Sequence, residues 1–475
     1  MKKVLISLLV VLILLGAAGY CGYRLYWNRT HVTVGGIEYS LDISELDLSG
    51  RQVPYIRELP ALQYLTDLDL RDTGLTEADY LYLRKVLPNC RIQWSVPFQG
   101  GFLPEDTETL TVASLSPEDI RMLSYLPQLK VLDGLGCEDT DTLLSLKEVY
   151  PQVRVLYQVS VEGTFYPWDT RSLVLKGSDI SGLSETLKLF PLLESVTLTA
   201  PVEEPELLSA LLEACPSLSF GYSLKFFDLE VSPDTEYLDL SGIAMENTET
   251  LESFLPHLPH LTKVDMVDCG ISDEEMAALN SRWPDTLFVW EIGIGHFKLR
   301  TDITYFMPYQ YRYVLSDKDA DQLKYLTELI CIDFGHMDIT RSDYLAYMTK
   351  MQYLLLCDTP IHDISGCANM PDLKYVEVFM TEVTDYAPLL ACPNLVDLNV
   401  SYTIPDDPMI FAQMTQLENL WIRGYDNEAW GKALQELMPN TRIVYTEGSS
   451  TARGWRELPN YYAQRDILGM WYMEG

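Results

Sequence analysis

The chain has 475 residues, of which 47% are hydrophobic, and it is therefore long enough to bury a large core. Its formal net charge is −35 at pH 7. Because this charge repels phosphate groups, nucleic acid is excluded as an expected partner, and an anionic membrane surface is disfavoured. A basic polypeptide, a carbohydrate or a cell-wall polymer remains compatible with it.

Residues 1–25 are interpreted as a membrane anchor or an export signal. Two lysines precede an apolar stretch over residues 4–23, and about 20 such residues are needed to span a bilayer. A cleavable signal peptide is the alternative, because Gly16 and Ala18 are small residues of the kind found before a cleavage site. The anchor is favoured because the apolar run continues past them. Both interpretations place the rest of the chain outside the cytoplasm, and only this segment is expected to contact the membrane.

Residues 26–310 repeat a block of about 64 residues. The first strand of successive blocks is marked by an alternating apolar pair: Leu46/Leu48, Leu110/Val112, Leu173/Leu175, Leu238/Leu240 and Ile303/Tyr305. Two further strands follow in each block, and the apolar alternation of the third is longer, as from Cys90 to Phe98. Each third strand then meets a turn, such as Gly100-Gly101, Gly163 or Gly295. The sequence therefore predicts a β-hairpin between successive trios of strands.

Helices are predicted between the second and third strands of the blocks. The segment after Leu75 has Thr76 as its N-cap and carboxylates in its first turn. The segment from Ser272 has the spacing of a capping box with Glu275 and ends before Pro284. Strands and helices thus alternate along residues 26–310.

Residues 311–447 carry a shorter repeat. The phrase apolar-x-x-apolar-x-x-apolar-x-apolar begins at Met348, Met370, Cys392 and Met414, so the units are about 22 residues long, which is the length of a leucine-rich repeat. We therefore expect an α/β fold: a horseshoe-like leucine-rich repeat solenoid. A parallel sheet should line its concave face, with short helices on the convex face and hairpins inserted every 64 residues or so.

Residues 41–446 resemble bacterial leucine-rich repeat surface proteins. The segment IHDISGCANMPDLKYVEV, from Ile361 to Val378, is similar to the 22-residue repeats of the internalin family. The resemblance implies a binding surface and no catalysis, and it identifies no ligand. The chain departs from the family where an asparagine usually closes the turn after the strand; threonine or cysteine stands there, at Thr73, Cys137, Cys269, Thr359, Thr381 and Thr403. We expect a weaker hydrogen-bond ladder at these turns.

Residues 448–475 form an aromatic tail that is predicted to fold from Gly454 onward, with a short helix near Asn460. The end of a solenoid exposes the core of its last repeat, so a terminal segment is expected to cap it. The side chains assigned to this role are Trp455, Tyr461, Tyr462, Ile467 and Trp471. A partner-binding peptide is the alternative interpretation of this tail.

No signature of catalysis or of a cofactor or metal site is found. The chain lacks H-E-x-x-H, G-x-S-x-G, P-loop and C-x-x-C motifs. His257 and His260 are interpreted as exposed loop histidines. The cysteines occupy apolar or turn positions of the repeats and are expected to be free thiols, although Cys331 and Cys357 are candidates for a bridge between neighbouring strands.

The middle residue of each L-x-L strand motif points out of the core and is often acidic. The series is Asp47, Asp69, Asp133, Thr197, Asp265, Asp333, Leu355, Glu377, Asn399 and Trp421. Its acidic half is explained either as a common feature of this repeat type or as an electrostatic guide for a cationic partner.

The C-terminal half of that series and the outward positions that flank it form an aromatic patch, which is the predicted partner-binding site. Its residues are Tyr353, Leu355, Tyr375, Glu377, Phe379, Asn399, Trp421 and Arg423. Tyrosine, tryptophan and arginine are enriched at energetic anchors of interfaces. Two alternatives are that the tail covers this surface, or that the strand phase is shifted by one residue.

These observations predict a membrane-anchored, extracytoplasmic protein that is not an enzyme and that binds a macromolecule, a protein or a cell-surface polymer, through its concave face. If the first segment is cleaved, the protein is secreted. A self-associating structural component of the cell envelope is one alternative, and a carbohydrate-processing enzyme is a second. The oligomeric state is left open.

Overall fold

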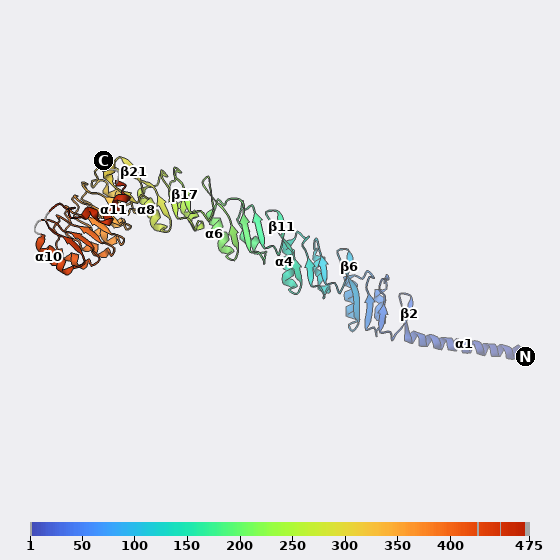
Figure 1. The fold of residues 1–475 in the computed structure, drawn as a ribbon. Helices are drawn as coiled ribbons and strands as arrows, with labels where there is room; N and C mark the ends of the chain where they lie inside the picture. The colour runs from blue at the N-terminus through green and yellow to red at the C-terminus, as the bar shows by residue number, and fades with distance from the viewer. Residues whose placement is uncertain (1, 425–426, 447, 471–475) are drawn as a thin grey trace. The chain divides into compact units, whose positions relative to one another are not determined.

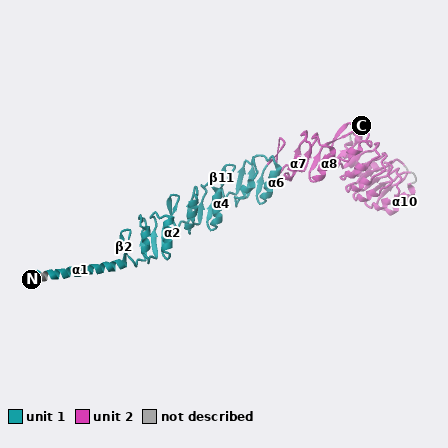
Figure 2. Cartoon of the chain, turned by 180° about the vertical axis from the view of Figure 1, so that it is seen from behind, with its two compact units in different colours: residues 1–222 teal, residues 223–475 magenta. Residues whose placement is uncertain are grey.

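A computed structural model describes residues 2–424, 427–446 and 448–470. The chain divides into two compact units, residues 1–222 and 223–475, drawn in teal and magenta in Figure 2. The division between residues 310 and 311 expected from repeat length stays a prediction, although it falls close to a change in sheet organisation described below.

Unit 1 begins with α1 (Lys2–Thr30), the long helix at the N-terminus in Figure 1. Its segment Ile6–Thr30 is long and apolar enough to cross a membrane. The most apolar part of this segment has no buried residue. A signal sequence has the same properties, so the structure is compatible with both interpretations of this segment.

Three blocks of parallel strands follow α1 in unit 1, each associated with an antiparallel hairpin. The parallel trios are β3 (Glu45–Asp47), β4 (Asp67–Leu70) and β5 (Arg91–Phe98); β7 (Thr109–Thr111), β8 (Val131–Asp133) and β9 (Arg154–Leu156); and β12 (Ser172–Leu175), β13 (Ser195–Leu198) and β14 (Ser219–Gly221). The hairpins are β1 (His31–Val34) with β2 (Ile37–Ser40), the end of β5 with β6 (Gly101–Pro104), and β10 (Gln158–Val161) with β11 (Thr164–Pro167). The predicted block of three strands and a hairpin is confirmed.

Unit 2 starts with one more block of the same kind. It contains the hairpin β15 (Leu224–Phe226) with β16 (Leu229–Val231), the trio β17 (Tyr237–Asp239), β18 (Lys263–Asp265) and β19 (Leu287–Val289), and the hairpin β20 (Glu291–Ile294) with β21 (Phe297–Arg300). In every block, a hairpin follows the third strand and ends the parallel ladder. The parallel sheet is therefore interrupted throughout residues 26–304.

From Tyr305 onward the sheet is continuous. Seven parallel strands pair in chain order: β22 (Tyr305–Phe306), β23 (Cys331–Asp333), β24 (Tyr353–Leu355), β25 (Tyr375–Glu377), β26 (Asp397–Asn399), β27 (Asn419–Trp421) and β28 (Arg442–Val444). From β23 to β27 each residue pairs with the one 22 positions later, as Tyr353 does with Tyr375. The 22-residue period and the leucine-rich repeat solenoid are confirmed by this register.

The convex segments change type with the repeat length. Ten-residue helices precede the last strand of long repeats: α2 (Glu77–Val86), α4 (Thr140–Val149), α6 (Pro205–Ala214), α8 (Asp273–Arg282) and α10 (Glu428–Leu437). The 22-residue repeats have 3₁₀ segments instead: η5 (Asp343–Tyr347), η6 (Ser365–Asn369), η7 (Ala387–Ala391) and η8 (Pro408–Gln413). The hydroxyl oxygens of Thr76 and Ser272 accept the predicted N-cap hydrogen bonds from Asp79 and Glu275 backbone N–H groups.

Shorter helical turns complete the repeats. They are η1 (Ile56–Ala61), α3 (Pro117–Met122), η2 (Leu123–Tyr125), α5 (Leu183–Leu187), α7 (Glu249–Phe254), η3 (Leu255–His257), η4 (Pro308–Tyr311) and α9 (Ala320–Leu323). His257 ends η3 and is only 5% exposed, so its assignment to an exposed loop is wrong; the 3₁₀ turn carries it inward. His260 is exposed as expected.

The turns after the strands use the residues that replace asparagine. The hydroxyls of Thr359, Thr381 and Thr403 each donate to the carbonyl three residues earlier, at 2.6, 2.7 and 2.7 Å. The residue before each threonine adopts a left-handed backbone conformation, with φ 58° at Met380. One hydroxyl supplies one donor, whereas an asparagine amide supplies two. All nine cysteines lie in the described ranges and are unpaired, including Cys331 and Cys357.

Candidate functional site: the outer face of the C-terminal sheet and its tail

The outer face of the C-terminal sheet is the face opposite the repeat core. Its side chains form two rows, because residues that pair in register point the same way. One row contains Cys331, Tyr353, Tyr375, Asp397, Asn419 and Arg442, and the other contains Asp333, Leu355, Glu377, Asn399, Trp421 and Val444. Between the rows, Leu354, Val376 and Leu398 are fully buried in the repeat core. The predicted strand phase is therefore right.

The Asp and Asn residues at the ends of strands in several of the parallel sheets have a local structural role that their spacing alone did not indicate. Asp47, Asp239 and Asp333 each accept the backbone N–H of the residue two positions later, at distances of 2.9 to 3.0 Å. Asp69, Asp133 and Asn399 make the same contact at 3.0 to 3.1 Å. A carboxylate or amide at this position satisfies a donor in the turn, which is why Asp recurs there.

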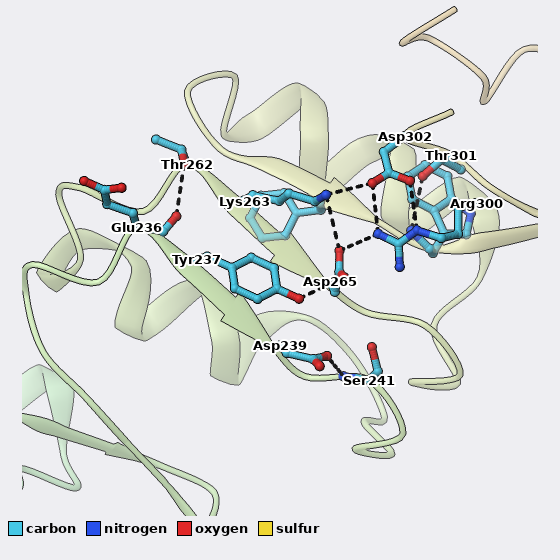
Figure 3. Close-up of polar contacts among 12 residues, drawn as sticks. Glu236, Tyr237, Asp239, Ser241, Thr262, Lys263, Asp265, Arg300, Thr301 and Asp302 are labelled. Atoms are coloured by element: carbon cyan, nitrogen blue, oxygen red, sulfur yellow. Dashed lines mark hydrogen bonds and ion pairs between the residues drawn. The ribbon is translucent and has the colours of Figure 1, made fainter. Parts of the chain in front are cut away.

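Asp265 belongs to the acidic half of the series of outward-pointing strand residues, and nearby cations neutralise its charge, as Figure 3 shows. Arg300 Nη2 lies 2.9 Å from both Asp265 Oδ1 and Asp302 Oδ2. Lys263 Nζ lies 2.7 Å from Asp302 Oδ2, and the Tyr237 hydroxyl donates to Asp265 Oδ2 at 3.0 Å. The hydrogen bond from Arg300, strengthened by Lys263, lowers the pKa of Asp302 to about 2. These charges do not act as a uniform negative surface.

The predicted partner-binding patch is brought together, but it is covered. The exposed fractions of its eight residues are 0% for Tyr375, Asn399 and Trp421, 1% for Arg423, 5% for Leu355 and Glu377, 6% for Tyr353 and 8% for Phe379. The alternative in which the tail covers this surface is the one found. Whether these residues also bind a partner stays a prediction.

The tail forms a second apolar core with the outer face. Its elements are η9 (Trp455–Glu457) and α11 (Pro459–Ile467). The Trp455 ring lies 5.1 Å from the rings of both Tyr375 and Trp421, centroid to centroid, and stacks on the tyrosine. Leu458 and Leu468 from the tail join Met307, Tyr353 and Leu355 in the same cluster.

Hydrogen bonds fix the tail along the sheet. Trp421 Nε1 donates to the Ala452 carbonyl at 2.8 Å, and Asn399 Nδ2 donates to the Ser450 carbonyl at 3.1 Å. Asn460 Nδ2 donates to Asp397 Oδ2 at 2.9 Å. The Gln310 amide donates to the Leu468 carbonyl at 2.7 Å, so the tail returns from the last strand to the start of the sheet.

Residues 448–470 lie across the outer face, and the expected cap on the last repeat stays a prediction. The aromatic and apolar residues of the outer face and of the tail form one buried cluster, which favours this position of the tail. The helix near Asn460 is confirmed. Tyr462 is 45% exposed and does not anchor the tail, whereas Trp471 lies outside the described residues.

A cavity of about 400 Å³ remains between the outer face and the tail. Asp333, Leu355 and Glu377 line it from the sheet, and Arg456 and Gln464 line it from the tail. Burial raises the pKa of both Asp333 and Glu377, although in each case hydrogen bonds act in the opposite direction. No group of three or more His, Cys, Asp or Glu side chains in the described part of the chain is placed to hold a metal ion.

Sequence reasoning offered a covering tail only as an alternative, and it did not assign Asn460 or Gln464 to the site. The tail has no repeat periodicity, and it contributes Trp455, Asn460 and Gln464. Trp455 bonds to Glu377, which is 78 residues away, and Asn460 bonds to Asp397, which is 63 residues away. The aromatic composition of the tail was the available signal. It indicated a folded segment, but it did not decide between the end of the last repeat and the aromatic face as the surface against which the segment packs.

Comparisons with known proteins identify leucine-rich repeat structures. No protein-family model and no curated protein matches the chain. A solved internalin (InlF) of Listeria monocytogenes is 16% identical, with 87% of this chain and 91% of that chain covered and a TM-score of 0.24. A leucine-rich repeat protein of Leptospira interrogans is 13% identical, with coverages of 85% and 96% and a TM-score of 0.23. Because these TM-scores are low, the repeat assignment rests on the strand register of this chain.

Proposed function

We propose that this chain is a membrane-anchored, extracytoplasmic leucine-rich repeat protein that binds a protein partner through the outer face of its C-terminal sheet, without catalysis. The anchor would be α1, in which the most apolar part of the segment Ile6–Thr30 has no buried residue. An apolar helical segment of this length with no buried residues is stable in a bilayer and costly in water.

The observation that supports the binding surface is the contact between the outer face and the tail. The face accommodates an aromatic peptide segment through ring stacking at Tyr375, an indole donor to Glu377 and side-chain bonds to backbone carbonyls. These contacts are the ones that protein interfaces use at their anchors. A partner segment with an aromatic anchor can make them in place of the tail.

Because residues 448–470 occupy the face, partner binding there requires displacement of the tail. The apparent affinity is then the intrinsic affinity multiplied by the fraction of molecules in which the tail is displaced. Loosening the tail should increase recovery of the partner, and removing the aromatic side chains of the sheet should abolish it.

The test is a pulldown from cell-surface and secreted material with the full-length chain in a nonionic detergent. It compares the natural chain with Trp455→Ala and with the triple variant Tyr375→Ala, Phe379→Ala, Trp421→Ala, all checked by circular dichroism. We expect a partner that is enriched by Trp455→Ala and lost with the triple variant.

A partner recovered equally by all three proteins would reject this face as the binding site. If the chain captures only itself, the self-associating alternative replaces the proposal. Tyr462→Ala is the matched control, because this tail aromatic is 45% exposed and its loss should leave recovery unchanged.

A further inference from the structure

The cavity beneath the tail has an unusual set of polar groups on its walls. Asp333 and Glu377 contribute carboxylates from strands β23 and β25. Among the described residues, Arg465 and His336 act on Asp333 and Arg456 acts on Glu377 through charge alone, without a direct ion pair. Both are away from bulk solvent, since Glu377 is 5% exposed and Asp333 is only partly exposed. A buried carboxylate without a cation is costly unless hydrogen bonds or a ligand compensate it.

The hydrogen bonds of these carboxylates leave one oxygen of each unused. Asp333 Oδ1 accepts the Gly335 backbone N–H at 3.0 Å. Glu377 Oε1 accepts from Trp455 Nε1 at 2.7 Å and from the Tyr375 hydroxyl. No described residue donates to Asp333 Oδ2 or Glu377 Oε2, so each carboxylate has an oxygen available to a donor.

A third acceptor comes from the tail. Gln464 lines the cavity and is 2% exposed, and its Oε1 has no hydrogen-bond partner in the described chain. Buried amide oxygens are nearly always hydrogen-bonded, so an unpartnered one indicates a missing donor. This observation is independent of the two carboxylates and points to the same missing chemistry.

Asp397 shows that burial of an acid under the tail is not itself the unusual feature. It is 2% exposed and lies on β26, where it pairs in register with Tyr375. Its two oxygens accept from Asn419 Nδ2 at 2.7 Å and Asn460 Nδ2 at 2.9 Å, and it does not line the cavity. The chain thus satisfies one buried carboxylate completely and leaves two partly open beside a cavity.

We propose that this cavity binds a small organic cation whose ammonium or guanidinium N–H groups donate to Asp333, Glu377 and Gln464. Asp333 and Glu377 are two strands apart, which is about 10 Å between their backbones, so a short diamine can place one ammonium at each carboxylate. Leu355, Phe379 and Met470 supply apolar wall for the methylene groups between the charges. Such charge-assisted contacts are among the stronger hydrogen bonds in proteins.

The cations on the cavity wall are compatible with this ligand. Arg465 acts on Asp333 through its charge, while its Nη1 donates to the Tyr461 hydroxyl at 3.2 Å and its Nη2 to the Met470 carbonyl at 3.3 Å. Arg456 and His336 are exposed, and water screens their charges. His336 Nδ1 is in addition 2.8 Å from Asp358 Oδ2.

The experiment is isothermal titration calorimetry on the full-length chain in a nonionic detergent, with 1,4-diaminobutane as the probe. Two compounds of the same chain length serve as controls: 1-aminobutane with one charge and 1,4-butanediol with none. We expect the diamine to bind, the monoamine to bind about tenfold more weakly, and the diol not to bind. No heat from the diamine, or equal binding of diol and diamine, overturns the proposal.

Variants locate the site. Asp333→Asn and Glu377→Gln should each weaken diamine binding about tenfold or more, whereas Asp397→Asn, the matched buried acid outside the cavity, should leave it unchanged. Equal losses in all three variants overturn the assignment.

A fourth variant guards against loss of binding through misfolding. Gln464→Glu adds a carboxylate at the third acceptor and should tighten diamine binding, a gain that a folding defect does not produce. Unchanged or weaker binding by a Gln464→Glu protein with native circular dichroism contradicts the proposed position of the cation.

Discussion

Trp455 Nε1 donates a 2.7 Å hydrogen bond to Glu377 Oε1, and the two residues are 78 positions apart in the chain. The same indole ring stacks on Tyr375, whose hydroxyl donates to the same carboxylate oxygen. One tail residue therefore fills the aromatic centre of the outer face and satisfies part of a buried acid. This relationship makes the tail an integral layer of the C-terminal repeats.

Removal of the Trp455 side chain should release the tail. Trp455→Ala leaves a large cavity and an unsatisfied Glu377, and substitutions of this kind cost about 3–5 kcal/mol. We expect residues 448–470 to lose hydrogen-exchange protection while the repeats keep theirs, as measured by mass spectrometry. Trp455→Phe, which keeps the ring but not the donor, should give a smaller effect. A tail equally protected in all three proteins would contradict this arrangement.

Glu377→Gln should stabilise the protein at neutral pH. Burial raises the pKa of Glu377 above its ordinary value, so the folded state takes up a proton more readily than the unfolded state. The stability associated with this proton is present below the ordinary pKa, near 4.5, and is lost as pH rises through the folded pKa. Glutamine does not titrate, and its amide oxygen can still accept from Trp455 and Tyr375.

The measurement is the free energy of unfolding in urea from pH 4 to pH 8 for both proteins. The difference between Glu377→Gln and the natural chain should be small at pH 4 and should grow with pH. A constant difference over this range would mean that the carboxyl group of Glu377 is not the titrating group.

Arg300→Met should destabilise the cluster of Figure 3 in a pH-dependent way. The pKa of Asp302 is lowered from 3.8 to about 2, mainly by the hydrogen bond from Arg300. The corresponding stability is fully present above about pH 4 and is lost as pH falls through about 2. We expect a loss of about 1 kcal/mol at pH 7, reduced by solvent screening, that shrinks toward pH 2.

Lys298→Met is the matched control for that variant. Lys298 pairs with Asp268 at 3.0 Å, but the side chains are 63% and 70% exposed. Exposed pairs contribute little, so unfolding in urea should be nearly unchanged at every pH. Similar losses from both variants would indicate that burial of the Arg300 cluster does not matter.

Met380→Gly should stabilise the protein. Met380 is 48% exposed and has φ 58°, a left-handed conformation that costs a residue with a Cβ atom about 1 kcal/mol. Its side chain contributes little burial to offset that cost. We expect a rise in unfolding free energy of about 0.5–1 kcal/mol, measured by thermal or urea unfolding. Glycine at the exposed Ile404, which has no positive φ, should instead be destabilising or neutral.

The repeat architecture was predictable because it depends on local spacing. The apolar positions that begin at Met348, Met370 and Cys392 fix both the 22-residue register and the inward side of each strand. Three of the described hairpins that follow a third strand were predictable from glycine turns, at Gly100-Gly101, Gly163 and Gly295, whereas the turn between β15 and β16 is made by Phe227 and Asp228. What spacing did not indicate is that each hairpin ends a parallel ladder, so that the sheet becomes continuous only from Tyr305.

The outer-face residues were predictable as a group, but their exposure was not. Strand alternation places Tyr353, Tyr375 and Trp421 on one side whatever lies above them. The tail has no repeat period, and only its packing decides that it crosses the outer face and leaves the cavity beside Asp333 and Gln464. The sequence by itself thus determined the solenoid and its phase, because hydrophobic periodicity is local. The covered face was decided only by tertiary structure, because it results from contacts between segments that share no sequence pattern.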